Sequence, residues 1–163
     1  MSLIFVDVEA WGDCPALGQM TEFGAVEYKS QDEFHGVLVT SRPSKENPAV
    51  PSETPHLTVA EIKPVFIKFE RWLLQFDAPW ILVSDNPAFD WQWINDGFLR
   101  ALGRNPFGHS ARRIGDYYAG LVGDFLASSK WKKLRVTKHD HNPCHDALGN
   151  VEAFKRFERG ERG

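Results

Sequence analysis

Four carboxylates and one histidine are spaced along this chain in a way that suits hydrolysis of a phosphodiester. Asp7 and Glu9 lie in an apolar N-terminal segment, Asp90 follows a second apolar segment, and His141 precedes Asp146 by five positions. Carboxylate oxygens are hard ligands of the kind Mg²⁺ takes. Two bound cations can activate a water and stabilise the leaving oxygen. A histidine with an unperturbed pKa of about 6.5 suits a general base.

Asp7 and Glu9 are two positions apart in the run of apolar residues 3–8. This run predicts a buried strand, on which side chains two apart leave the same face. Two adjacent buried carboxylates repel each other and are costly unless a cation compensates them. The pair therefore indicates a metal site. The alternative is that both side chains point to solvent from an edge strand.

Asp90 follows the apolar segment 80–84 and a turn at Asn86. From the start of a helix it could reach back across the ends of neighbouring strands. Asp85 competes for this role, and Asn86 could hydrogen-bond a ligand or the backbone. Phe89 is expected to anchor the helix start in the core. The alternative is that Asp85 or Asp90 only caps the helix.

The third segment contains two histidines that offer two registers with the same spacing. His141 is followed five positions later by Asp146, whereas His145 is followed five positions later by Asn150. Only the first register places a carboxylate where a hard cation needs one. The alternatives are an exposed loop histidine and a zinc site that includes Cys144, for which few ligands are available.

Residue patterns predict an α/β domain whose first three strands form an antiparallel meander. The predicted strands are 3–8, 23–28, 33–39, 80–84 and, as the weakest, 110–114. Helices are predicted from the capping box at Thr58 through Leu73, from Asn86 to Gly103, mostly over 112–126, and over 146–157. Residues 11–18 and the proline-containing 41–55 are predicted as loop and extended connection, and 128–137 fits no single element.

Composition indicates one globular domain over residues 1–158 with a short polar tail, 159–163. The chain has 163 residues, 42% hydrophobic and 13% aromatic, and a net charge of −3. This charge argues against a uniformly basic nucleic-acid surface, although Lys and Arg gather in the second half. No apolar stretch is long enough to cross a bilayer. Two cysteines without CxxC spacing favour reduced thiols and a cytoplasmic location.

The three segments resemble the three motifs of the DEDD family of 3′-5′ exonucleases, in the subgroup whose last motif is His-x-x-x-x-Asp. Val6-Asp7-Val8-Glu9 is similar to the first motif, Asn86-Pro87-Ala88-Phe89-Asp90 to the second, and His141 through Asp146 to the third. The resemblance covers essentially the whole chain. It implies a ribonuclease-H-like fold, a mixed five-stranded sheet with helices on both faces.

The resemblance also implies roles for the five residues. Asp7 would bridge two Mg²⁺ or Mn²⁺ ions, Glu9 and Asp146 would complete the first site, and Asp90 would support the second. His141 would act as general base. The implied reaction releases nucleoside 5′-monophosphates from a 3′ end.

The chain departs from the resemblance after Glu9. Many family members have Thr-Thr-Gly there, whereas this chain has Ala10-Trp11-Gly12. Trp11 would stack on a base or pack on the core. For Met20, Trp91 and Trp93, core packing is the favoured interpretation. The residues expected to contact substrate are Ala10, Trp11, Asn86 and Phe89.

The expected partners are 3′ ends of single-stranded RNA or DNA, with no membrane, and a homodimer is compatible with the sequence. RNA or short oligonucleotides are favoured because the chain is a small domain without a polymerase-binding extension. One alternative is a DNA proofreading or repair exonuclease. Another is a non-catalytic nucleic-acid-binding domain, against which the presence of all five chemical positions argues.

Overall fold

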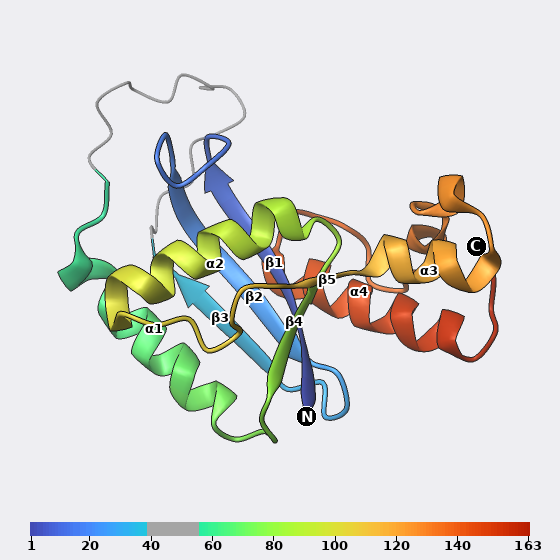
Figure 1. Ribbon diagram of the computed structural model, residues 1–163, viewed down its shortest axis with the longest axis horizontal. Coiled ribbons are helices and arrows are strands. Elements are labelled where there is room, and N and C mark those ends of the chain that lie inside the picture. Colours follow the sequence, from blue (N-terminus) through green and yellow to red (C-terminus); the bar gives the residue numbers. More distant parts are fainter. Residues whose placement is uncertain (39–55) are drawn as a thin grey trace.

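Five strands form one mixed sheet in the order β3-β2-β1-β4-β5 in the computed structural model, which describes residues 1–38 and 56–163 (Figure 1). The strands are β1 (Ser2–Trp11), β2 (Gln19–Glu27), β3 (Glu33–Val37), β4 (Trp80–Ser84) and β5 (Arg112–Arg113). β1, β2 and β3 pair antiparallel, and β1, β4 and β5 pair parallel. The predicted meander and the placement of a fifth strand within 110–114 are confirmed.

β1 is the middle strand, and its side chains alternate between two cores. Ile4, Val6 and Val8 belong to one buried cluster, whereas Phe5 belongs to the other. This alternation explains why the strand is apolar at almost every position. It also places Asp7 on the same face as Phe5.

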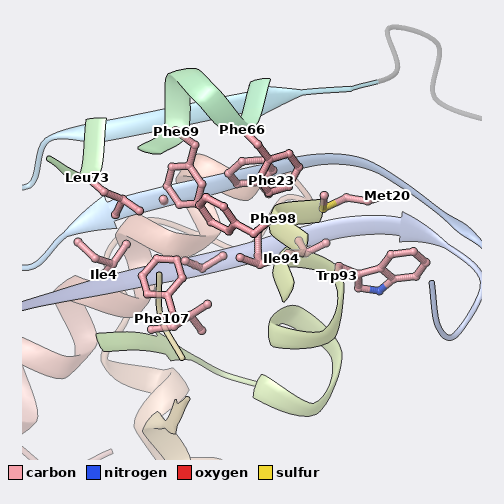
Figure 2. Packing of buried hydrophobic residues seen from close by; sticks show 14 of the residues in the cluster. Ile4, Met20, Phe23, Phe66, Phe69, Leu73, Trp93, Ile94, Phe98 and Phe107 are labelled. Carbon is pink, nitrogen blue, oxygen red and sulfur yellow. The ribbon is translucent and has the colours of Figure 1, made fainter. Parts of the chain in front are cut away.

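Two helices, α1 (Val59–Leu73) and α2 (Pro87–Leu102), cover one face of the sheet (Figure 1). α1 begins with the predicted capping box, in which Thr58 and Glu61 bond to each other's backbone N–H. Its aromatic side chains interleave with those of β2 and α2 in the core that Figure 2 shows. The buried side chains labelled there include Phe23, Phe66, Phe69, Trp93, Phe98 and Met20. The core positions expected for Met20 and Trp93 are thus confirmed.

The opposite face is covered by α4 (Pro143–Glu158), with α3 (Ile114–Val122) beside it (Figure 1). Two 3₁₀ turns, η1 (Phe125–Ala127) and η2 (Lys130–Leu134), connect α3 to the segment that precedes α4. Trp131 of η2 is fully buried in this second core. The polar C-terminal residues pack back on the same layer, where the Gly163 N–H donates to the Tyr118 hydroxyl at 3.1 Å.

Several predicted boundaries were wrong. β1 continues to Trp11, which pairs with Gln19 beyond a bulge between Glu9 and Ala10, so the loop is shorter than expected. The stretch 112–126 is mostly helical, as predicted, but its helix α3 starts only after β5 and is followed by a 3₁₀ turn. α4 begins at Pro143, because proline is favourable in the first turn of a helix. The predicted connection 41–55 and the end of the predicted third strand at Val39 lie outside the described residues.

Among residues 1–38 and 56–163, no helix combines the length and apolar character that a bilayer crossing requires.

Candidate active site

Asp7 and Glu9 lie on the most interior strand of the sheet and not on an edge, so the solvent-facing alternative is wrong. Both leave the face that α4 covers, where they meet Asp146 from the first turn of that helix. One carboxylate oxygen from each of the three residues lies within 4.8 Å of the others. Residues far apart in sequence are thereby brought to distances at which they can share a cation.

Two features of the sequence bring α4 this close to the sheet. The Asn142 side chain caps the helix by accepting hydrogen bonds from Cys144 N at 3.0 Å and His145 N at 3.4 Å. Gly24, the residue directly opposite Asp7 on β2, leaves room for the helix start. A Cβ atom at Gly24 would lie 2.3 Å from the carbonyl carbon and oxygen of Pro143. Gly24 was not predicted as a site residue.

Asp90 approaches the cluster from the other layer. It lies in the first turn of α2, is 4% exposed, and its Oδ1 accepts a hydrogen bond from Val8 N at 3.1 Å. The capping alternative is wrong, because the N-cap of α2 is Asn86, whose side chain makes no capping bond. Asp85 instead pairs with Lys132, with 2.5 Å between Oδ2 and Nζ.

Burial and mutual repulsion make this cluster electrostatically costly without a cation. Burial raises the pKa of Asp7 to about 9, and the charges of Asp90, Asp146 and Glu9 add to the increase. Burial likewise raises the pKa of Asp90 to about 7. Hard oxygen donors from four crowded carboxylates, two of them with raised pKa values, fit a divalent cation.

Two histidines lie at the open side of the cluster. The Nδ1 atom of His141 is 3.7 Å from Oε1 of Glu9, and its side chain is about half exposed. The Nδ1 atom of His139 is 2.7 Å from Oδ2 of Asp146. The two imidazoles meet edge to face, with centroids 4.4 Å apart. No role was predicted for His139, because its position before the third motif gave no signal of a contact with Asp146.

His145, the histidine of the rival register, is turned away from this cluster. Its Nδ1 lies 2.9 Å from Oδ2 of Asp140, and this hydrogen bond raises the pKa of His145. The same contact holds the pKa of Asp140 below its usual value. The geometry therefore agrees with the His141 to Asp146 register.

The residues expected to contact substrate surround the cluster on β1 and at the start of α2. Ala10 and Trp11 end β1 and are partly exposed. Phe89 is partly buried and packs on the aromatic core, edge-on to Trp93 at 6.0 Å between centroids. Asn86 remains at the turn before α2. Their contacts with a nucleotide stay predictions.

Comparison with known proteins gave no matching family model. The chain is 29% identical to the 3′-5′ DNA exonuclease Cap18 of Escherichia coli over 178 aligned positions, which cover 96% of this chain and 91% of that protein.

Solved structures share the fold at lower identity. The nuclease domain of 3′hExo, a DEDDh family member bound to rAMP, matches with a TM-score of 0.68 and 14% identity over 99% of this chain and 96% of that one. The zinc-bound E. coli ExoI–ssDNA complex matches with a TM-score of 0.55 and 17% identity, over 97% of this chain and 39% of that one. The chain is thus similar in sequence to a 3′-5′ DNA exonuclease, and it shares the fold of the nuclease domain of a DEDDh family member.

Proposed function

We propose that this protein is a metal-dependent 3′-5′ exonuclease that removes nucleoside 5′-monophosphates from single-stranded nucleic acid. The observation that carries the proposal is the convergence of Asp7, Glu9 and Asp146, whose oxygens lie within 4.8 Å of one another between β1 and α4. Asp90 adds a fourth buried carboxylate from α2. A stable fold gains nothing from such a set unless a cation compensates it.

Asp7, Glu9, Asp146 and Asp90 would hold two divalent cations, Mg²⁺ or Mn²⁺. When bound, such ions lower the pKa of a water and stabilise the charge on the leaving 3′ oxygen. The raised pKa values of Asp7 and Asp90 fall again when a cation replaces the proton. The same carboxylates that destabilise the metal-free protein thereby become charged ligands.

His141 would accept the proton of the attacking water. It is half exposed beside Glu9, at the open side of the cluster where a water can reach it. Its backbone has a positive φ of 63°, which is uncommon for a residue other than glycine. Such conformations concentrate at functional sites, because they hold a side chain in one direction at an energetic cost.

The kind of sugar is a separate part of the proposal. RNA was favoured from the small size of the chain, but the relative with 29% identity is named a DNA exonuclease. We therefore propose DNA 3′ ends as the principal substrate, with RNA as the competing one. Ala10 and Trp11, at the end of β1 where many DEDD members carry two threonines, are the residues whose contacts would set this preference.

The test uses 5′-labelled RNA and DNA oligonucleotides of one sequence, with Mg²⁺, with Mn²⁺ and with EDTA. We expect a ladder that shortens from the 3′ end, and no products in EDTA. Asp7→Asn, which keeps the size of the side chain and removes a ligand oxygen, is the matched inactive control. If neither polymer is shortened with either metal, while both bind, the protein is a nucleic-acid-binding domain and the proposed activity is wrong.

A further inference from the structure

A cavity of about 490 Å³ opens beside the carboxylate cluster and is lined by positive side chains. Asp7 lines this cavity, and residues of η2 and of the segment that follows it contribute a cationic wall. The other lining residues are Asp85, Lys132, Arg135, Lys138 and His139. Three of these side chains carry a full positive charge, in a chain whose net charge is −3. The cationic wall is therefore a local feature and not a consequence of overall composition.

Arg135 is fixed in this wall by groups that are themselves buried. Its guanidinium donates to Oδ1 of Asn150 and lies over the Trp131 ring, 5.1 Å from the centroid. Asn150 and Trp131 are both fully buried. The buried Nε of Arg135 has no hydrogen-bond partner in the described part of the chain. The positive charge is thus held at a set place close enough to Asp7 to offset part of the rise that burial and the neighbouring carboxylates cause in its pKa.

The two lysines of the wall are more exposed and differ in their partners. Lys132 pairs with Asp85, which also lines the cavity, at 2.5 Å between Nζ and Oδ2, and the Lys132 side chain is 45% exposed. Lys138 makes no ion pair with a carboxylate among residues 1–38 and 56–163. An ammonium group on a flexible stem binds phosphate as a point charge. Lys132 can therefore leave Asp85 and bind a phosphate oxygen instead, without any change in the backbone.

We propose that this cavity binds one internucleotide phosphate, the one on the 5′ side of the bond that is cut, through Lys132 and Lys138. The proposal rests on the proposed function, since it supposes a chain whose terminal linkage lies on Asp7 and its partner carboxylates. For an enzyme acting at a 3′ end, the neighbouring phosphate belongs to the second linkage from that end. Asp85 holds Lys132 until the phosphate arrives and competes with it.

The site should make a difference only for substrates that have a second phosphate. The test compares a single-stranded oligonucleotide with the p-nitrophenyl ester of thymidine 5′-monophosphate, which has one phosphodiester. Lys132→Ala and Lys138→Ala should each lower kcat/KM for the oligonucleotide roughly tenfold, as expected for one charge-assisted hydrogen bond. Both should leave hydrolysis of the nitrophenyl ester within about twofold of wild type. Lys133→Ala is the matched control, because Lys133 is exposed on the same turn and does not line the cavity.

Two further measurements test the effect of Asp85 on KM and which linkage of the substrate the lysines bind. Asp85→Asn removes the competing carboxylate and should lower KM for the oligonucleotide, the opposite of the lysine variants. Replacing the second linkage from the 3′ end by a neutral methylphosphonate should abolish the difference between wild type and Lys138→Ala. The same replacement at the sixth linkage should leave that difference intact.

The outcomes separate this site from the proposed activity. If wild type hydrolyses neither substrate, the proposed function is wrong and the phosphate site falls with it. If wild type hydrolyses both and the two lysine variants behave as Lys133→Ala does, the activity stands and the phosphate site is wrong. A methylphosphonate effect at the sixth linkage but not at the second would likewise overturn the assignment. All lysine variants are at exposed positions, and equal melting temperatures would show that they fold as wild type.

Discussion

Gly24→Ala tests whether the close approach of α4 to the sheet creates the site. The added Cβ would lie 2.3 Å from the backbone C and O atoms of Pro143 and 2.4 Å from Cys144 N. Carbon contacts are favourable from about 3.5 Å, so the helix start must retreat by roughly 1 Å. Asp146, in the same turn, moves with it. A displacement of this size at a catalytic group costs on the order of 10² in rate.

Overpacking of this kind costs about 1–3 kcal/mol of folding free energy. For a chain of this size, that lowers Tm by about 2–12 °C. The assay is kcat on a labelled oligonucleotide with Mn²⁺, together with a thermal melt of the same preparation. We expect kcat to fall roughly 10²-fold while the protein remains folded at 25 °C.

Gly120→Ala is the matched control. Gly120 lies in α3, and a Cβ there has nothing within 4 Å. Alanine at an exposed helical position should leave kcat unchanged and stabilise the fold by about 0.5–1 kcal/mol. If Gly24→Ala retained wild-type kcat and Tm, the helix would not depend on the glycine for its approach, and our explanation of how Asp146 reaches Asp7 would be refuted.

Three further predictions concern the carboxylates and the histidines. Metal-dependent hydrolysis in a gel assay should be abolished by each of four substitutions, Asp7→Ala, Glu9→Ala, Asp90→Ala and Asp146→Ala. Near wild-type turnover in one of these variants would show that its residue is not a metal ligand. The raised pKa values of Asp7 and Asp90, about 9 and about 7, mean that the metal-free fold is stabilised below pH 4 and loses this stability as pH rises through 7 and 9. Tm in EDTA should therefore fall from pH 5 to 9, and Asp7→Asn should flatten the decline; a profile of equal slope in both would contradict the assignment. His141→Ala should lower kcat by roughly 10²–10⁴ and remove the acidic limb of the pH–rate profile. His139→Ala should lower kcat less, and His145→Ala should have kcat close to wild type. A larger loss of kcat in His145→Ala than in His141→Ala would overturn the register.

Much of the fold was predictable because local pattern and tertiary packing agree. The capping box at Thr58 and the apolar spacing after it place α1 correctly, and the branched run 80–84 coincides with β4. β5 is two residues long and both are exposed arginines, so no hydrophobic pattern marks it. The extension of β1 to Trp11 depends on a bulge and on pairing with Gln19, which are contacts between strands. Such contacts leave no trace in the periodicity of either segment.

The chemical residues of the site were predictable for a different reason. Acidic side chains inside apolar segments are costly, so their presence at Asp7 and Asp146 is itself a signal. The residues that position them carry no such signal. Gly24 is important because it has no Cβ where the backbone of Pro143 and Cys144 lies. His139 is important because its loop brings the imidazole to Asp146 at the start of α4. The first depends on a distance between segments more than a hundred residues apart in the chain, and the second on how the loop before α4 folds, although His139 and Asp146 are only seven positions apart.

The most direct test of a 3′-end hydrolase is one incubation of a linear single-stranded oligonucleotide and its covalently closed circle, with Mg²⁺ or Mn²⁺. The account predicts that the linear form is converted to nucleoside 5′-monophosphates while the circle stays intact. It also predicts that Asp7→Ala leaves both forms intact. Cleavage of the circle, or products that carry 3′ phosphates, would contradict it.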